Sequence, residues 1–324
     1  MTVKVKANAN IALVKYWGKR EPKLNLPAVG SISATLDNLN TETEISIATS
    51  GNDEIIYNGK PANEKEYGRI SNFLNSFRKE FGVKDFFSIN TINNFPSGAG
   101  LASSASGFAA LAAGVNKISN TRISDRELSI LARKGSGSAA RSIFGGFVEM
   151  KTGEGVDSHT DYAEQIAPAN HWDLSVVILV TSGKQKKISS TDGMNATAYS
   201  SPYYNSWISS SKFDLYEAKK AIKQKDFEKL ADVTEFSTLK MHGLAMAARP
   251  GIIYWNGTTL DLINEVKDMR TAGSPVFFTI DAGPQLKIFT PSENVTKIKD
   301  HFSDRNGIET IIVSGIGDGV KIVE

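Results

Sequence analysis

The chain has 324 residues, of which 40% are hydrophobic and 22% are charged, as in an ordinary globular protein. Lys and Arg number 37 against 35 Asp and Glu, and this net charge of +2 argues against nucleic-acid binding, which usually needs a larger basic excess. The chain contains no cysteine, which excludes disulfides, thiolate metal ligands and cysteine nucleophiles and fits a reducing cytoplasm.

The N-terminal segment, residues 1–19, has lysines at four positions within what would need to be an apolar stretch, so it is not a signal peptide. The strongest apolar runs, 107–115 and 173–180, are far too short to cross a bilayer. From these features we expect a soluble, cytoplasmic protein with no membrane partner.

The first half of the chain predicts strands followed by helices. In chain order, the expected elements are strands at 43–49 and 85–92, helices at 102–117 and 124–135, and a strand at 145–150. The second of these helices begins with a capping-box pattern, in which Ser124 is followed by Glu127.

A polar stretch over 151–172 is the expected boundary between two units, residues 1–172 and 173–324. The elements expected after it are a strand at 174–181, helices at 213–224, 226–242 and 260–273, strands at 275–281 and 286–290, a helix at 292–303 and a strand at 309–315. Leu260, Ile263, Val266 and Met269 mark the expected buried face of the third helix. Strands interleaved with helices in this way predict an α+β fold rather than a doubly wound sheet.

Residues 95–107, FPSGAGLASSASG, form a glycine-rich stretch between an expected strand and an expected helix. Backbone N–H groups at such a helix start, its dipole and the neighbouring hydroxyls can hold phosphate, and glycines allow close approach. The Lys-Ser or Lys-Thr pair of a Walker loop is missing, and a tight turn before a closely packed helix explains the glycines equally well. The dense serines favour phosphate.

Positive charge gathers at Lys15, Lys19 and Arg20, in a segment that otherwise has the pattern of a strand. A lysine that points inward from a buried strand is costly unless it meets an anion, but a solvated edge with long, flexible lysines explains the same pattern. A second polar cluster over 182–194 includes Lys186 and Lys187, and it fits either a flap that closes over phosphates or an ordinary solvated loop.

Two single residues are candidates for chemistry. Arg141 stands among small residues, where a guanidinium can reach a carboxylate and pair with it through two hydrogen bonds, although a surface position is the alternative. Asp281 follows a hydrophobic strand and precedes a sharp turn, which fits a rigidly held general base or a plain turn. The histidines show no metal-ligand spacing, and His242 could hydrogen-bond a substrate or simply end a helix.

Together these segments resemble the GHMP family of small-molecule kinases and, within it, the diphosphomevalonate decarboxylase branch. Residues 96–105 match the family's P-x-x-x-G-L-x-S-S-A motif, with Ala102 where most members have glycine. The branch's other motifs occur in the expected order, at 10–19, 136–142, 190–194 and 281–284. The sequence departs from the branch at Gln285, usually Asn, and at Thr191-Asp192, where some bacterial members carry an Arg-containing pair, which bears on how the substrate diphosphate is held.

This resemblance implies an N-terminal ribosomal-protein-like domain with a left-handed β-α-β unit, a C-terminal ferredoxin-like domain, and a site in the cleft between them. It implies an enzyme that uses ATP and Mg²⁺ to phosphorylate the 3-hydroxyl of mevalonate 5-diphosphate, after which phosphate and CO₂ leave to give isopentenyl diphosphate. It also implies that Asp281 is the base, that Lys15 keeps it ionised, and that Arg141 holds the substrate carboxylate.

The same resemblance implies the binding residues and the assembly. Substrate binding is expected at Asn10, Tyr16, Trp17, Lys19, Ser136, Gly137, Ser138, Ser190 and Met194. ATP binding is expected at Pro96, Ser97, Gly98, Ala99, Gly100, Leu101, Ala102, Ser103, Ser104, Ser106, Lys186 and Lys187. Mg²⁺ would be held mainly by ATP phosphates, with Ser104 as its one candidate protein ligand, and the protein would be a homodimer. The alternatives are a mevalonate 5-phosphate decarboxylase or mevalonate 3-kinase of the same branch and, from a different class, a GHMP-fold sensor without turnover.

Overall fold

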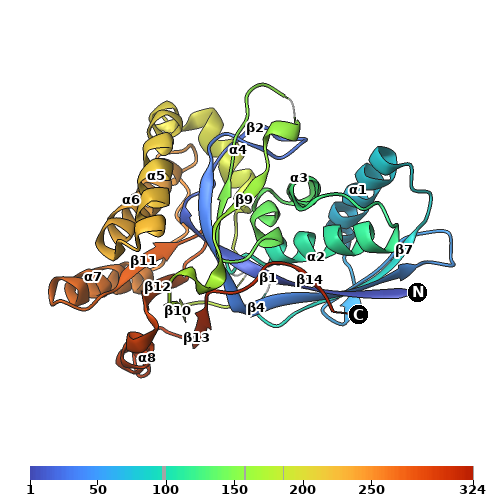
Figure 1. The fold of residues 1–324 in the computed structure, drawn as a ribbon. Helices are drawn as coiled ribbons and strands as arrows, with labels where there is room; N and C mark the ends of the chain where they lie inside the picture. The colour runs from blue at the N-terminus through green and yellow to red at the C-terminus, as the bar shows by residue number, and fades with distance from the viewer. Residues whose placement is uncertain (97–99, 157, 185, 324) are drawn as a thin grey trace.

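The computed structural model describes residues 1–96, 100–156, 158–184 and 186–323. It contains two main sheets with helices packed against both, which confirms the predicted α+β class (Figure 1). The long strands β1 (Thr2–Val14) and β4 (Ser31–Ile47) pair in antiparallel fashion and run through the middle of the molecule, so they connect its two halves (Figure 1).

The first sheet has eight strands, in the order β14-β1-β4-β7-β5-β6, with β8 paired to β4 and β9 paired to β8. Its other strands are β5 (Glu54–Tyr57), β6 (Lys60–Pro61), β7 (Phe87–Asn93), β8 (Phe147–Met150), β9 (Ala163–Ala167) and β14 (Lys321–Ile322). Only β5 and β7 are parallel to one another among these pairs, and α1 lies between them in the chain. Because β14 pairs with β1, the end of the chain returns to the first sheet.

Three helices pack against this sheet and one another: α1 (Glu64–Phe81), α2 (Ser103–Ile118) and α3 (Asp125–Gly135). A Cβ at Gly114 of α2 would lie 2.2 Å from Cδ1 of Ile45, so the small residues of α2 permit its close packing on β4. The capping box predicted for α3 is confirmed. Helix α1 is absent from the sequence-based predictions, although Asn63 and Glu66 form a capping box at its start.

The second sheet has four antiparallel strands in the order β11-β12-β10-β13. These are β10 (Leu174–Val180), β11 (Phe277–Ile280), β12 (Leu286–Pro291) and β13 (Thr310–Gly315). Val176 and Ile178 of β10 join the core shared with β1 and β4, whereas Val177 and Leu179 join the core formed with α7 (Gly257–Thr271) and α8 (Val295–Phe302). Both faces of the strand are buried, which explains the continuous apolar run over 176–180.

The helices α5 (Tyr204–Gln224) and α6 (Phe227–Met246) close the core between the two sheets (Figure 1). Helix α5 begins at Tyr204 rather than at the predicted residue 213, because the buried Trp207 already belongs to its first turn. The face predicted for α7 is partly wrong, because Leu260 is 50% exposed and Leu262 occupies the buried position instead.

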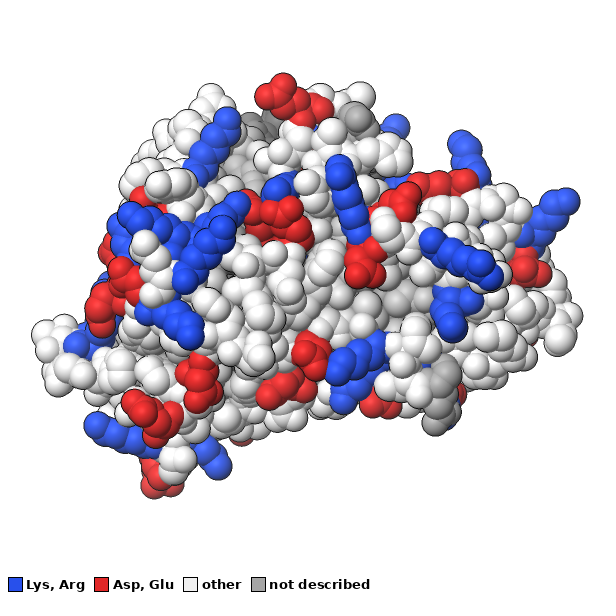
Figure 2. Space-filling view, in the orientation of Figure 1, with Lys and Arg blue, Asp and Glu red and all other residues white. Residues whose placement is uncertain are grey.

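Short elements complete the fold. They are β2 (Lys19–Glu21), β3 (Leu26–Pro27), α4 (Ser190–Ser200) and the 3-10 helices η1 (Gly137–Ile143), η2 (Ser158–Thr160), η3 (Ala169–His171) and η4 (Ser292–Asn294). On the face shown in Figure 2, basic side chains gather over the α5–α6 side with acidic ones among them. Among the described helices, none combines the length and the apolar character that crossing a bilayer requires.

Candidate active site

Asp281 lies directly after β11 and is held between two lysine ammonium groups. Its Oδ1 accepts a 2.8 Å hydrogen bond from Nζ of Lys15, which follows β1, and its Oδ2 accepts a 3.3 Å bond from Nζ of Lys287 on β12. The two lysine side chains are 1% and 0% exposed, whereas that of Asp281 is 23% exposed. The solvated-edge alternative for Lys15 is therefore wrong, and the lysine meets the anion that its burial requires.

The charges of these three residues depend on one another. Burial alone would raise the pKa of Asp281, but Lys15 and Lys287 outweigh it and hold that pKa well below its usual range. Burial lowers the pKa of Lys15 to about 8, although Asp281 opposes this shift, and burial also lowers the pKa of Lys287. Asp281 is therefore ionised at neutral pH.

Arg141 lies on η1 and is 2% exposed, so the surface alternative is wrong. Its Nε donates hydrogen bonds to Oγ of Ser33 (2.9 Å) and to Oδ1 of Asn10 (3.3 Å), and its Nη1 donates to Oγ of Ser31. Burial lowers its pKa to about 10, which leaves the guanidinium charged at neutral pH. Among the described residues Nη2 has no hydrogen-bond acceptor, so the guanidinium is held through Nε and Nη1 while Nη2 remains available.

One cavity of about 580 Å³ brings most of the predicted residues together. The predicted residues that line it are Asn10, Lys15, Tyr16, Trp17, Lys19, Gly100, Leu101, Ala102, Ser103, Ser104, Ser136, Gly137, Ser138, Arg141, Lys186, Ser190, Met194 and Asp281. They come from the end of β1, the start of α2, η1, the start of α4 and the turn after β11. Segments far apart in the sequence thus meet around one space.

The start of α2 offers hydrogen-bond donors to this space. Ala102 precedes the helix in a left-handed conformation (φ 61°) and provides no side-chain cap, so backbone N–H groups of the first turn lack that partner. The hydroxyl-bearing residues Ser103 and Ser104 line the cavity beside them. This arrangement has the donors and the dipole that phosphate needs at a helix start.

Two predicted ATP-binding residues, Ser106 and Pro96, are placed differently. Ser106 is fully buried, with its hydroxyl 2.6 Å from that of Thr41, and Pro96 is exposed. Neither Ser106 nor Pro96 lines this cavity or its neighbour within the described parts of the chain. The predicted residues Ser97, Gly98 and Ala99 lie outside the described residues.

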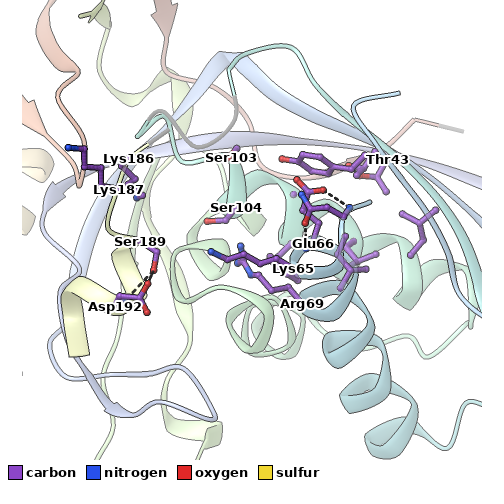
Figure 3. Close-up of a pocket in the computed structure, with 18 residues that line it drawn as sticks. Thr43, Lys65, Glu66, Arg69, Ser103, Ser104, Lys186, Lys187, Ser189 and Asp192 are labelled. Atoms are coloured by element: carbon purple, nitrogen blue, oxygen red, sulfur yellow. Dashed lines mark hydrogen bonds between the residues drawn. The ribbon is translucent and has the colours of Figure 1, made fainter. Parts of the chain in front are cut away.

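A second cavity, of about 350 Å³, adjoins the first between α1, α2 and the segment before α4. Lys65, Arg69, Ser103, Ser104, Lys186, Ser189 and Asp192 line both. In Figure 3, Lys65 and Arg69 reach from α1 across this space toward Ser189 and Asp192, with Ser104 beside them. Lys187 lines only this second cavity.

Lysines also surround the start of α4. Nζ of Lys186 donates hydrogen bonds to Oγ of Ser190 (2.7 Å) and to the Ala282 carbonyl (3.2 Å), and burial lowers the pKa of Lys186 to about 8. Nζ of Lys19 lies 3.4 Å from Oγ1 of Thr191 on the same helix. The start of α4 at Ser190 is therefore bordered by the two cations Lys19 and Lys186.

Aromatic residues after β1 complete the wall. The hydroxyl of Tyr16 is buried and has no hydrogen-bond partner among the described residues, and a Cβ at Gly137 would lie 2.2 Å from it. Nε1 of Trp17 donates a 2.9 Å bond to Oγ1 of Thr197, which ties α4 to this segment, and Met194 packs in the same cluster as Trp17. Tyr16 thus presents an unused hydroxyl beside η1.

Comparison with known proteins decides the family. The family model described as "Diphosphomevalonate decarboxylase-like N-terminal domain" matches residues 7–163, and "Mevalonate 5-diphosphate decarboxylase C-terminal domain" matches residues 176–314. The diphosphomevalonate decarboxylase of Saccharomyces cerevisiae is 38% identical over 317 residues, which cover 92% of this chain and 80% of the relative. The chain belongs to the diphosphomevalonate decarboxylase family.

Solved structures of diphosphomevalonate decarboxylases have the same fold. The mevalonate diphosphate decarboxylase of Staphylococcus aureus is 38% identical, with a TM-score of 0.94, covering 100% of this chain and 98% of that one. A structure described as "MDDEF in complex with MVAPP, AMPPCP and Magnesium" is also 38% identical, with a TM-score of 0.93 and coverages of 100% and 99%. The fold expected from the resemblance is confirmed.

This member of the decarboxylase family has site residues that the sequence reasoning missed. Lys287 interrupts an apolar strand, which is the signal that could have found it, and Lys65 and Arg69 lie on the helix that was not predicted. His242 is buried beneath the site with Nε2 3.3 Å from the Ile280 carbonyl, and burial lowers its pKa to about 3, so the ring is neutral. It lines neither of the two cavities within the described residues, which disfavours a contact with substrate.

Gln285, the departure from the family pattern, supports the strand ends below Asp281. Its side chain is fully buried, and its Oε1 accepts a 2.7 Å hydrogen bond from the backbone N–H of Thr181. An amide at this position therefore fixes the turn after β11 to the end of β10.

Proposed function

We propose that this protein catalyses the ATP-dependent decarboxylation of mevalonate 5-diphosphate to isopentenyl diphosphate, with ADP and phosphate as the other products. The observation that carries the proposal is the shared cavity. It presents a carboxylate held between two lysines, a buried guanidinium whose Nη2 has no acceptor among the described residues, and a helix start with serine hydroxyls. These groups match the hydroxyl, the carboxylate and the phosphates of the two substrates.

In the first step, the 3-hydroxyl oxygen of the substrate attacks the γ-phosphorus of ATP and ADP leaves. Asp281 orients this hydroxyl through the side that faces the cavity. Because the pKa of Asp281 is held low, the carboxylate accepts the proton late, when the forming O–P bond has made the hydroxyl acidic. Lys15 keeps the carboxylate in place and charged during this transfer.

In the second step, the C3–O bond breaks and the new phosphate leaves with its electron pair. The C1–C2 bonding pair then becomes the C2–C3 double bond, and C1 leaves as CO₂. Arg141 would hold the substrate carboxylate so that the C1–C2 bond aligns with the departing phosphate, because a guanidinium pair fixes an angle. The hydrogen bonds from its Nε and Nη1 to Ser31, Ser33 and Asn10 hold the guanidinium in the one orientation that this alignment requires.

The diphosphate of the substrate would bind between η1 and the start of α4. Tyr16 offers its unpaired hydroxyl there, Lys19 offers its ammonium group, and Ser136 and Ser138 offer hydroxyls. Thr191-Asp192 stand where some bacterial members carry an Arg-containing pair, and the Lys19 ammonium group lies 3.4 Å from Oγ1 of Thr191. These contacts favour an anion of two phosphates at the 5 position.

ATP would place its phosphates at the start of α2, and its nucleoside would fill the second cavity toward α1. Lys186 lines both cavities and Lys187 lines the second, so both suit the phosphate chain. The described residues contain no cluster of carboxylates or histidines fit to hold a metal, and Asp281 already meets two lysines, so Mg²⁺ would bind mainly to ATP oxygens with Ser104 nearby. When bound, Mg²⁺ neutralises phosphate charge during transfer.

The assembly and location are part of the same proposal. Residues 1–172 and 173–324 would form the two domains, since the two family models match on either side of that division, and β14 would return from the second domain to pair with β1 of the first. A cytoplasmic homodimer fits a metabolic enzyme without cysteines, and Phe213, Tyr216 and Phe236 supply exposed aromatic surface on α5 and α6. Light scattering after gel filtration tests the dimer, and a monomeric mass would reject it.

A substrate comparison tests the proposed reaction. The protein is incubated with ATP and Mg²⁺ and with mevalonate, its 5-phosphate or its 5-diphosphate, and ADP and the organic product are measured directly. We expect isopentenyl diphosphate from the 5-diphosphate and a much lower kcat/KM for the other two. Preference for the 5-phosphate, or a stable 3-phosphorylated product, would favour the related decarboxylase or the 3-kinase instead.

A further inference from the structure

Lys287 is a fully buried lysine that contacts two functional segments at once. Its Nζ donates a 3.3 Å hydrogen bond to Oδ2 of Asp281 and a 3.1 Å bond to the carbonyl of Gly100, three residues before α2. Its neighbours along β12, Leu286 and Ile288, belong to the core with α7 and α8. Because side chains alternate along a strand, Lys287 points to the opposite face, toward the site.

The two segments that Lys287 joins also touch directly. Gly100 has a positive φ of 83°, and a Cβ there would lie 3.2 Å from Cα of Gly283 and 3.5 Å from the Ala282 carbonyl. The last turn before α2 therefore rests against the turn that carries Asp281. A shift of one segment is felt by the other through this contact and through Nζ of Lys287.

The ammonium group of Lys287 is one of several charges that act on Asp281. The charged or titratable groups that face this carboxylate from the surrounding elements are Lys15, Arg141, Lys186, His242 and Lys287. Only Lys15 and Lys287 donate hydrogen bonds to it among the described residues, and the other hydrogen bond of the Lys15 ammonium group goes to the Ala12 carbonyl rather than to the segment before α2. Lys287 is therefore the described cation that reaches both segments.

We propose that Lys287 is a positioning residue that couples the phosphate-holding segment before α2 to the carboxylate of Asp281. This inference deepens the proposed function and rests on it for the role of Asp281. Through one ammonium group, the placement of the ATP phosphates and the orientation of the carboxylate are set together. A phosphate chain that seats well at the start of α2 thereby finds the 3-hydroxyl already oriented.

A purely structural lysine would behave differently. A buried ion pair that only stabilises the fold lowers the melting temperature when it is broken, and it changes neither the pH dependence of turnover nor the affinity for nucleotide in the molecules that remain folded. A coupling lysine changes both. The pair Lys240–Asp214 on α6 and α5 offers the matched control, because it is also largely buried, 16% and 2% exposed, and its residues line neither of the two cavities.

Three variants separate the two contacts of Lys287. Lys287→Met removes the charge and the donor, Lys287→Gln keeps a donor without charge, and Lys287→Arg keeps the charge. Lys240→Met is measured alongside. Each is characterised by its melting temperature, by titration with AMPPCP in the presence of Mg²⁺, and by kcat and the KM of ATP between pH 5 and pH 9 with direct detection of isopentenyl diphosphate.

For Lys287→Met we expect about a tenfold weaker affinity for AMPPCP, because a charged hydrogen bond to the Gly100 carbonyl is lost. Removing one of the two ammonium groups that together outweigh burial also raises the pKa of Asp281, so the acid limb of kcat, which lies below pH 5 in the wild-type protein, should move into the measured range. Lys287→Arg should restore the pH profile, whereas Lys287→Gln should recover the nucleotide affinity but not the wild-type pH profile. Lys240→Met should lower only the melting temperature.

The proposal is overturned if Lys287→Met keeps the wild-type pH profile and nucleotide affinity within twofold while losing stability, as Lys240→Met does. Should Lys287→Met not fold, Lys287→Gln and Lys287→Arg decide by the same comparison. Failure of the proposed function is a separate result, because it would appear as a wild-type protein that releases no isopentenyl diphosphate. The AMPPCP titration still tests the coupling in that case, since it needs no turnover.

Discussion

Replacing Arg141 by lysine tests the role of the buried guanidinium. The change keeps a positive charge but removes the planar group that Asn10, Ser31 and Ser33 hold in one orientation. A lysine ammonium can meet the substrate carboxylate at one point and cannot fix its angle. Arg141→Lys should therefore bind mevalonate 5-diphosphate with a modestly higher Kd and lose most of the product formation.

The size of the loss follows from the hydrogen bonds at stake. One hydrogen bond between charged partners contributes about 1.5–3 kcal/mol. If that bond is made fully only when the C1–C2 bond is aligned, its loss slows product formation by roughly 10- to 150-fold. Arg141→Ala also removes the charge, and it should fall further while leaving a buried cluster of hydroxyl and amide groups without their donor.

Rapid quench with ATP labelled on the γ-phosphate separates the two steps. In Arg141→Lys a 3-phosphorylated species should accumulate before CO₂ appears, because phosphoryl transfer uses Asp281 and needs less from the carboxylate. Arg133→Lys is the matched control, since Arg133 is also fully buried and lines neither of the two cavities within the described residues. Near-normal isopentenyl diphosphate output from Arg141→Ala would show that Arg141 does not hold the substrate carboxylate for decarboxylation.

Three further predictions concern the other charged groups. Asp281→Asn should leave ATP and substrate binding nearly intact and lower kcat by several orders of magnitude. The control Asp214→Asn changes an ion-paired carboxylate that is not among the described residues lining the two cavities, and it should not lower kcat in this way. Turnover of Asp281→Asn within tenfold of the parent would remove Asp281 from the mechanism. Lys19→Ala should raise the KM for mevalonate 5-diphosphate more than it lowers kcat, and an unchanged KM with collapsed kcat would contradict this role. Burial lowers the pKa of Lys15 and Lys186 to about 8, so both lysines lose protons as the pH rises through that value. The kcat/KM should therefore fall above pH 8, while kcat holds to higher pH because bound anions keep the ammonium groups charged. A kcat/KM that stays flat to pH 9.5 would contradict this prediction.

Much of the fold could be predicted because its local signals agree with its packing. Residues 176–180 are continuously apolar because both faces of β10 are buried, and the capping box at Ser124 marks the true start of α3. Helix α1 was missed although its start carries a capping box, because only Phe73, Leu74 and Phe77 of its 18 residues are buried and its apolar stripe is narrow. The exposure of Leu260 depends on how α7 is rotated against the sheet, which its own spacing does not determine.

The roles of the site residues could not be predicted from local sequence patterns alone. From the sequence, Lys15, Arg141 and Asp281 each have an alternative without a catalytic role: a solvated edge, a surface position and a plain turn. The structure decides between these alternatives and a role in the site, because burial and pairing depend on segments more than 100 residues apart. The resemblance to a known family named these three, but Lys287 belongs to none of the motifs behind it. Its position becomes informative only when β12 is seen to place it behind Asp281.

The ratio of CO₂ to ADP shows whether the protein decarboxylates its substrate as well as phosphorylating it. Mevalonate 5-diphosphate labelled at the carboxyl carbon is supplied with ATP and Mg²⁺, and released CO₂ is counted against ADP in the same reaction. We expect one CO₂ for each ADP in the wild-type protein, because phosphorylation and carboxylate loss would occur in one cavity. Release of ADP without CO₂ would contradict it, since the site would then phosphorylate the 3-hydroxyl and stop.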